Sequence, residues 1–219
     1  MPRHAPSLAL GVLVLLTLPF SIYAARFGWQ GMTQDLSART YLYVAGDLSA
    51  NGALSLHMAL GALLTLAVPL QLVTPLRRRA PGVHRWTGRV LTLGAMLTGV
   101  AGLTFIALRG TVGGWPMDAG FTLYGLLIVL AGGATLAAAR RRDIARHRRW
   151  ALRLFVLILG SWAFRAMYVV WFLATGGLGS TEALTGPFDR VMVFAFYLPW
   201  LALLELYLRP PYRRAPWTG

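Results

Sequence analysis

The chain has 219 residues, of which 57% are hydrophobic and only 13% are charged, yet its formal net charge is +14. A soluble domain rarely combines such apolarity with so little charge, so the composition indicates a membrane protein. The sequence contains no Cys, which excludes disulfides, thiolate metal sites, iron–sulfur clusters and covalent attachment of a c-type haem.

Six apolar runs are long enough to cross a bilayer as helices. A spanning helix needs about 20 mostly apolar residues, because the hydrocarbon core is about 30 Å thick and a helix rises about 1.5 Å per residue. The runs are residues 8–25, 53–74, 90–108, 121–139, 150–174 and 191–208. Backbone hydrogen bonds inside lipid must be satisfied internally. We therefore expect an all-α, polytopic bundle of six transmembrane helices that forms one integral-membrane domain over residues 1–219.

The first apolar run has an alternative interpretation. A short basic start followed by an apolar stretch is also the pattern of a signal peptide, with cleavage near Ala25. The run is longer than a usual signal-peptide core, and the site before Arg26 lacks a clean small-x-small pattern. An uncleaved first helix is therefore favoured.

All 21 basic residues are Arg, and most of them fall between alternate apolar runs. One side of the expected bundle carries Arg3, Arg77, Arg78, Arg79, Arg85, Arg89, Arg140, Arg141, Arg142, Arg146, Arg148, Arg149, Arg153, Arg209, Arg213 and Arg214. The other side carries Arg26, Arg39, Arg109 and Arg190 with Asp35, Asp47, Asp118, Glu182 and Asp189. The positive-inside rule then predicts that both termini lie in the cytoplasm. We expect the Arg-rich connections to contact anionic lipid headgroups, and we expect no nucleic-acid partner.

Two of the Arg-rich connections resemble each other. An Arg triplet precedes His84 by four residues, and a second triplet precedes His147 by the same spacing. This similarity predicts an internal repeat, in which the second and third helices correspond to the fourth and fifth. The alternative is convergence, because the topology alone requires Arg in both connections. A repeat would place His84 and His147 at equivalent points, one on each hairpin, where the two imidazoles could face one another.

Several of these blocks resemble a known family. Leu56-His57, Leu70-Gln71, the stretch 83–89 with its His-Arg-x-x-Gly-Arg pattern, and the stretch 146–153, with Arg165 beyond, are similar to a bacterial family of membrane proteins called the domain of unknown function 2306 family. The resemblance covers roughly residues 50–175. It implies a multi-pass protein of the bacterial cytoplasmic (inner) membrane, and it supplies no reaction.

Polar side chains inside the apolar runs are candidates for function, because each one is costly in a bilayer. His57 and Gln71 lie fourteen residues apart, nearly four helical turns, and so share one face of the second helix. Arg165 lies more than two turns inside the fifth helix, with Ser161 on its face. Its candidate partners are His57, Asp118 or an anionic ligand. For His57 and Gln71 the structural alternative is hydrogen bonding between helices.

Glu205 is the only acid within an expected span, one turn from the cytoplasmic end of the sixth helix. Arg89 and Arg153 enter the membrane at a similar depth. An intramembrane acid normally finds a basic partner, so an ion pair with one of them is favoured over a role in a proton or ion pathway.

Three functions are compatible with these residues. The first is a redox protein that uses a b-type haem or a quinone. His84 and His147 would be the axial metal ligands, and Arg85, Arg89 and Arg153 would neutralise the haem propionates. Both His residues stand at helix entrances, which is shallow for a haem. His57 lacks a His partner on the outer side, so no path through two haems is expected.

The second function is a carrier or binding protein for a small anionic or lipid-like ligand, with Arg165 and His57 lining an outer cavity. Transporter sites often lie at broken helices, and Pro69 is the only break that we expect. The third function is a non-catalytic membrane scaffold or accessory subunit, in which every polar residue is structural.

Overall fold

The computed structural model describes residues 5–209, and the described chain is helical with connecting loops. Its elements are α1 (Ala5–Thr33), α2 (Leu48–Ala67), the short 3-10 helix η1 (Val68–Leu72), α3 (Thr74–Arg79), α4 (Pro81–Arg109), α5 (Trp115–Arg140), α6 (Ile144–Thr175), α7 (Pro187–Ala195) and α8 (Leu198–Leu208). Six segments are long and apolar enough to cross a membrane, which confirms the predicted all-α bundle of six spans. Arg3, Arg213 and Arg214 lie outside the described residues.

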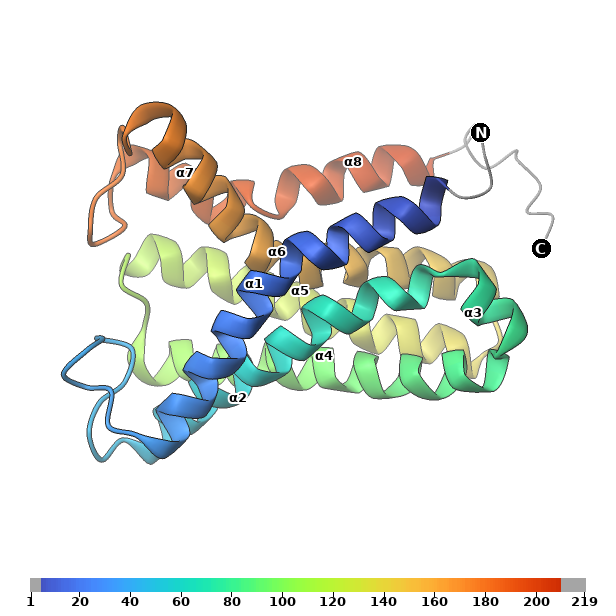
Figure 1. Ribbon diagram of the computed structural model, residues 1–219, viewed down its shortest axis with the longest axis horizontal. Coiled ribbons are helices and arrows are strands. Elements are labelled where there is room, and N and C mark those ends of the chain that lie inside the picture. Colours follow the sequence, from blue (N-terminus) through green and yellow to red (C-terminus); the bar gives the residue numbers. More distant parts are fainter. Residues whose placement is uncertain (1–4, 210–219) are drawn as a thin grey trace.

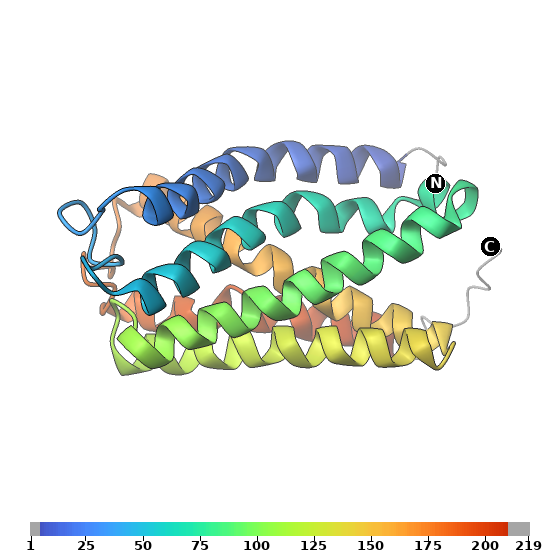
Figure 2. The same cartoon turned by 90° about the horizontal axis from the view of Figure 1, so that it is seen from below.

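Each helix joins its neighbours in chain order to form the bundle. α1 packs on α2, α2 on α4, α4 on α5, and α5 on α6, while α2 also contacts α6 (Figure 1). α7 packs on α5, and α8 packs on α6. The first turns of α1, the short α3, the α5–α6 turn and the end of α8 lie at one end of the bundle (Figure 2). We call this the Arg-rich end, since it carries Arg77–Arg79 and Arg140–Arg142. The connections 34–47, 110–114 and 176–186 lie at the opposite end, which we call the acidic end.

Most spans are longer than predicted, because helices continue past the point where the apolar run stops. The third span begins at Pro81 rather than residue 90, and the fifth begins at Ile144 rather than residue 150. Arg side chains on these added turns can reach water or headgroups with their charged ends, so they do not terminate a helix. His84 and His147 are therefore each the fourth residue of a helix. The internal repeat itself stays a prediction.

The sixth span is broken, which the sequence analysis did not foresee. α7 ends at Ala195 and α8 starts at Leu198, and the break lies beside Pro199. Proline has no N–H, so it cannot continue the hydrogen-bond ladder of the preceding helix. Tyr197 at the break is fully buried, and its hydroxyl donates to the carbonyl of Gly120 on α5 at 3.1 Å. The expected break at Pro69 is also present, as the 3-10 turn η1 that ends the second span.

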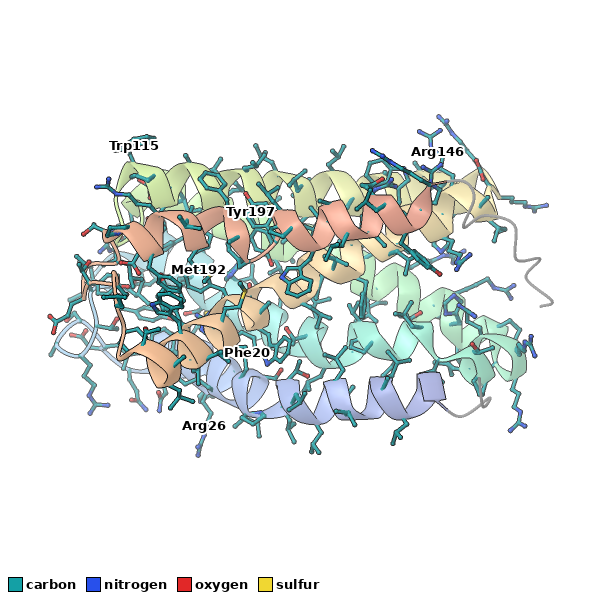
Figure 3. All side chains as sticks on the ribbon, turned by 90° about the horizontal axis from the view of Figure 1, so that it is seen from above. Phe20, Arg26, Trp115, Arg146, Met192 and Tyr197 are labelled. Carbon is teal, nitrogen blue, oxygen red and sulfur yellow. The ribbon has the colours of Figure 1, made fainter. Side chains whose placement is uncertain are left out.

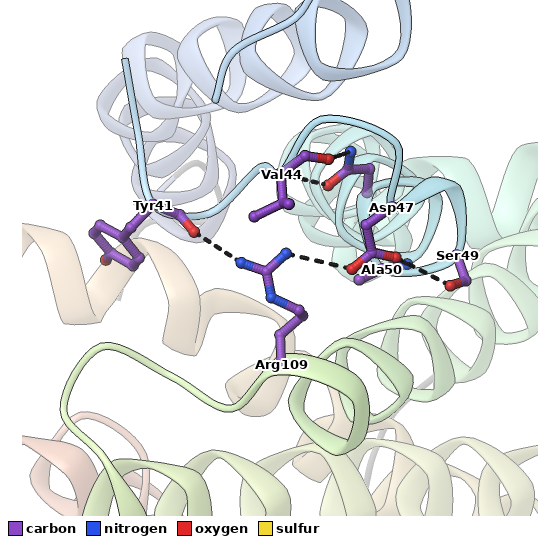
Figure 4. A network of polar contacts seen from close by, with 7 residues as sticks. Tyr41, Val44, Asp47, Ser49, Ala50 and Arg109 are labelled. Carbon is purple, nitrogen blue, oxygen red and sulfur yellow. Dashed lines mark hydrogen bonds and ion pairs between the residues drawn. The ribbon is translucent and has the colours of Figure 1, made fainter. Parts of the chain in front are cut away.

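A polar network fixes the start of α2 at the acidic end (Figure 4). Asp47 caps the helix, and its Oδ1 accepts from the backbone N–H of Ala50 at 3.1 Å. Arg109 at the end of α4 donates through Nη1 to Asp47 Oδ2 at 3.3 Å and through Nη2 to the carbonyl of Tyr41 at 3.3 Å. Because of this cap, the second span begins at Leu48, five residues before the predicted start.

The Asp47 cap should make stability depend on pH. Its hydrogen bonds lower the pKa of the carboxyl below its ordinary value of 3.8, with the Ala50 N–H contributing most. A depressed pKa in the folded state means that the charged form stabilises the fold above about pH 4, and that this contribution disappears as the pH falls through the folded-state pKa. We expect wild type to unfold at a higher temperature than Asp47→Asn at pH 6, and the gap to be smaller at pH 3. A gap of equal size at both pH values would contradict this.

Candidate functional site

A cavity of about 40 Å³ lies inside the bundle, between α1, α2, α4, α5 and α6. Its polar lining consists of His57, Thr65, Thr98, Tyr124, Ser161 and Arg165, and the rest is apolar. We call it the Arg165 cavity. One water needs roughly 10–15 Å³ by this measure, so the space takes a few waters or one small polar group.

His57 and Arg165 lie at the same depth. His57 is nine residues from the start of α2, about 14 Å along the helix, and Arg165 is ten residues from the end of α6, about 15 Å. The start of α2 and the end of α6 both lie at the acidic end, so the two side chains belong to the same half of the membrane. His57 is therefore deeper than the predicted start at residue 53 implied, because α2 begins at Leu48.

One nitrogen of His57 is fixed by the neighbouring helix. Its Nδ1 lies 3.0 Å from the carbonyl oxygen of Thr98 on α4. A carbonyl oxygen only accepts, so Nδ1 carries a hydrogen and Nε2 of the neutral ring is left as an acceptor. This approach depends on Gly102, because a Cβ there would lie 2.9 Å from Nδ1. Within the described chain no side chain or carbonyl bonds Nε2, so it can take a hydrogen from a water or a ligand hydroxyl.

Arg165 has no acidic partner in the part of the chain that the structure describes. Its Nη1 donates to the carbonyl of Ser161, one turn earlier, at 3.3 Å, and its guanidinium carbon stands 5.1 Å from the ring centre of Phe20. Arg165 lines the cavity and is also an exposed residue. Asp118, a partner considered from sequence, instead accepts from the backbone N–H of Thr111 at 2.6 Å.

Two residues of this site were missed by the sequence analysis. Phe20 points from α1 toward α6, whereas Arg26 on the same helix points away from the bundle (Figure 3). Tyr124 is buried in α5, and its hydroxyl donates to the carbonyl of Leu157 on α6. Aromatic side chains are common in apolar spans, so nothing in the sequence distinguishes these two from ordinary core residues.

Gln71 lies near the opposite membrane surface from His57 and does not line the cavity. Its Nε2 donates to the hydroxyl of Thr87 on α4 at 2.7 Å, and this bond joins two helices. Its Oε1 is buried with no protein partner in the described chain. Gln71 therefore has the structural role of joining the second span to α4.

Glu205 forms the ion pair that the sequence analysis favoured, and the partner is Arg153. Arg153 Nε donates to Oε1 at 2.6 Å and Nη2 donates to Oε2 at 2.8 Å, which is a two-point contact between α6 and α8. The guanidinium also lies over the ring of Trp150 at 4.6 Å. Arg89, the other candidate partner, is exposed on α4.

Breaking this pair should destabilise the attachment of α8. Arg153 is mostly buried and Glu205 is nearly half exposed, so we expect a coupling free energy of about 1–2 kcal/mol, between the values for exposed and buried pairs. Glu205→Gln and Arg153→Gln should each lower the unfolding temperature by roughly 3–6 °C, and the double variant should be no worse than the worse single one. Arg89→Gln is the control. Additive effects of the two single variants would mean that no pair exists.

His84 and His147 occupy similar positions at the Arg-rich end. His147 Nδ1 lies 3.1 Å from the carbonyl of Thr135 on α5, which leaves its Nε2 for another partner. Nδ1 of His84 is buried without a hydrogen-bond partner in the described chain, and His84 is close enough to His147 for their charges to interact. Arg85 and Arg89 are exposed, whereas Arg153 is held by Glu205. No group of three or more His, Cys, Asp and Glu that could hold a metal occurs among residues 5–209.

The comparisons with known proteins bear on the family and not on the activity. A family model described as a predicted membrane protein, DUF2306, matches residues 54–208. The match includes every cavity residue from α2 to α6 and leaves out α1. Comparison with curated proteins and with solved structures finds no match. The matched segment is well over half of the chain, so this multi-pass helical protein belongs to the DUF2306 family of predicted membrane proteins.

Proposed function

We propose that the protein binds the anionic group of a small or lipid-like ligand in the Arg165 cavity. The observation that carries this proposal is a guanidinium in the outer half of a membrane-spanning helix with no carboxylate beside it in the described chain. Charged side chains at such a depth cost about 2.5–3.5 kcal/mol on insertion scales and are almost always paired. A ligand would supply the missing negative charge.

The chemistry of the cavity suits one small polar group. Arg165 offers several N–H donors in a planar fork, and the Ser161 hydroxyl lines the same space. Nε2 of neutral His57 offers an acceptor for a hydroxyl hydrogen or a water. A haem or a quinone ring is larger than the cavity, so this site favours the ligand-binding function over the redox one.

The orientation in the membrane completes the proposal. We place the Arg-rich end, with both chain termini, in the cytoplasm and the Arg165 cavity in the outer half of a bacterial inner membrane. The Arg side chains of the Arg-rich end would contact anionic headgroups, each worth about 1 kcal/mol near the surface.

Ligand-dependent stability tests the proposal. Purified protein in an uncharged detergent would be heated with acetate, inorganic phosphate, dodecanoate or dodecyl phosphate at equal ionic strength. We expect at least one of these anions to raise the unfolding temperature of wild type and of Arg190→Met, but not of Arg165→Met. Arg190 is an exposed cation on α7 and is a matched control for loss of charge. Equal shifts in all three proteins, or none, would contradict the proposal and favour a structural scaffold.

A second candidate function rests on His147. A metal-bound His usually gives its other ring hydrogen to a carbonyl, and His147 has this arrangement with Thr135. With His84 close by, the Arg-rich end could hold a haem b between the two imidazoles. An absorption spectrum of protein expressed with added haem tests this. A Soret band that disappears in both His84→Ala and His147→Ala would support it, and the absence of a band in wild type would exclude it.

A further inference from the structure

We infer that the ligand of the Arg165 cavity is a long-chain carboxylate, and that its acyl chain lies in the outer leaflet between α1 and α6. This inference rests on the proposed function and specifies the class of ligand. Three features of the structure support it: which helices line the cavity beside Arg165, how small the cavity is, and which side chains follow Arg165 and Phe20 along these helices.

α1 and α6 both line the cavity, through Phe20 and Ala24 on α1 and Ser161 and Arg165 on α6. These helices touch where the indole N–H of Trp162 donates to the carbonyl of Leu16 at 3.2 Å. From there they diverge toward the acidic end (Figure 1). Arg165 and Phe20 lie one turn beyond the contact, where the helices begin to separate. Arg165, an exposed residue, therefore lies where α1 and α6 begin to diverge, and we call the diverging faces of these two helices beyond this point the wedge.

The side chains along this wedge are apolar or aromatic. Val169 follows Arg165 by four residues on the same face of α6 and is 58% exposed. Tyr23 follows Phe20 by three residues on α1, is 54% exposed, and is close enough to Arg165 to interact with its charge. Its ring stacks on Phe27 one turn further out, with centroids 5.8 Å apart. An acyl chain placed here would have hydrocarbon and ring surfaces on both sides.

The size of the cavity selects the head group. About 40 Å³ accepts a carboxylate, which has three heavy atoms, but not a phosphodiester with its substituents. The planar fork of Arg pairs with a carboxylate through two parallel hydrogen bonds. An acyl chain with a terminal carboxylate therefore neutralises the charge of Arg165 and places its hydrocarbon against the exposed side chains of Val169 and Tyr23.

A series of probes separates the head group from the chain. In an uncharged detergent, dodecanoate should stabilise wild type and Arg190→Met and leave Arg165→Met unchanged. Methyl dodecanoate has the chain without the charge, acetate has the charge without the chain, and dodecyl phosphate has a larger head. We expect each of these three to need at least tenfold more probe for the same shift in unfolding temperature.

The other outcomes would overturn the role of the acyl chain, the preference for a carboxylate, or the role of Arg165. If acetate or inorganic phosphate acts as well as dodecanoate and depends on Arg165, the acyl chain is irrelevant and only the proposed function stands. If dodecyl phosphate is equal to dodecanoate, selection for a carboxylate is wrong. If no anion acts through Arg165, the proposed function and this inference fail together.

Two neighbouring alanines test the location of the head group. Ala24 lines the cavity and is 1% exposed, whereas Ala25 points to the outside of α1. Ala24→Leu should fill the cavity and weaken the effect of dodecanoate at least tenfold, and Ala25→Leu should leave it unchanged. Equal binding by both variants would place the carboxylate elsewhere.

Photolabelling of the unmodified protein locates the chain without any substitution. Dodecanoate with a diazirine at its methyl end should label peptides that contain residues 20–27 of α1 and 165–173 of α6. Excess unlabelled dodecanoate should suppress the labelling. Labelling confined to other helices, or not suppressed by competitor, would show that the wedge is not the binding path.

Discussion

Arg165→Met is expected to unfold at a higher temperature than the wild type in the absence of ligand, while losing binding of dodecanoate. A charge in the outer half of a span costs a few kcal/mol, and methionine removes this cost while keeping a similar length. The variant also loses the contact with Phe20, about 0.5–2 kcal/mol, and a hydrogen bond to Ser161. We expect a net gain of about 1 kcal/mol, or 2–4 °C.

The same substitution should weaken dodecanoate binding far more than it changes stability. Removing one member of a desolvated charge pair costs about 2–5 kcal/mol, which corresponds to a loss of roughly thirtyfold or more in affinity. Titration of the unfolding temperature against dodecanoate measures this loss. Arg190→Met should change neither quantity. If Arg165 were structural, Arg165→Met would instead be less stable than wild type, so the sign of the temperature change separates the two roles.

Asp189→Ala is expected to give the largest loss of stability in the chain. This carboxylate is 0% exposed and accepts four hydrogen bonds. The donors are the hydroxyls of Tyr168 and Ser180, both at 2.7 Å, and the backbone N–H groups of Thr181 at 3.0 Å and Gly186 at 2.9 Å. Alanine would remove the acceptor from all four donors, of which the Gly186 N–H is buried and the other three are partly buried, at a cost of about 3–5 kcal/mol. The unfolding temperature should therefore fall by roughly 10 °C.

A nearby acid provides the control for Asp189. Glu182 belongs to the same connection between α6 and α7 but is exposed, so Glu182→Ala should change the unfolding temperature by less than about 1–2 °C. Asp189→Asn keeps an acceptor of the same shape and should fall between the two. If Asp189→Ala is as stable as Glu182→Ala, this network does not hold the α6–α7 connection.

The number of spans could be predicted from the sequence because each span needs a long apolar run. The ends and breaks of the helices depend instead on caps, on polar turns and on contacts with other helices. The early start of α2 comes from the cap formed by Asp47, and the early starts of α4 and α6 come from Arg-rich turns that still satisfy helical hydrogen bonds. The break at Tyr197 combines Pro199 with a buried hydrogen bond to α5. Such a tertiary contact has no signature in one sequence.

In the candidate site too, some residues could be predicted from the sequence, whereas their contacts could not. Arg165 and His57 stand out in apolar runs, so their importance could be inferred before any fold was known. That they share a depth, and that α1 completes the cavity through Phe20, follows only from the packing. The ion pair of Glu205 could be anticipated because an intramembrane acid needs a cation, while the choice of Arg153 over Arg89 required the arrangement of α6 against α8.

The sequence placed Asp189 among the acids of its side of the bundle, and nothing in it predicted that this carboxylate is fully buried. Composition shows only that an acid lies in a polar connection. In the structure, the connection folds back so that its own N–H groups surround the carboxylate. Glu182, another acid seven residues earlier in the connection 176–186, remains exposed. The path of the backbone determines that Asp189 is buried and Glu182 is exposed, and this path could not be predicted from the sequence.

Native mass spectrometry tests the central claim most directly. Wild type and Arg165→Met would be released from an uncharged detergent after incubation with an equimolar mixture of dodecanoate and dodecanol. We predict that wild type retains one dodecanoate and no dodecanol, and that Arg165→Met retains neither. Equal retention of dodecanoate by the two proteins, or none by either, would contradict the assignment of Arg165 as the partner of an anionic ligand.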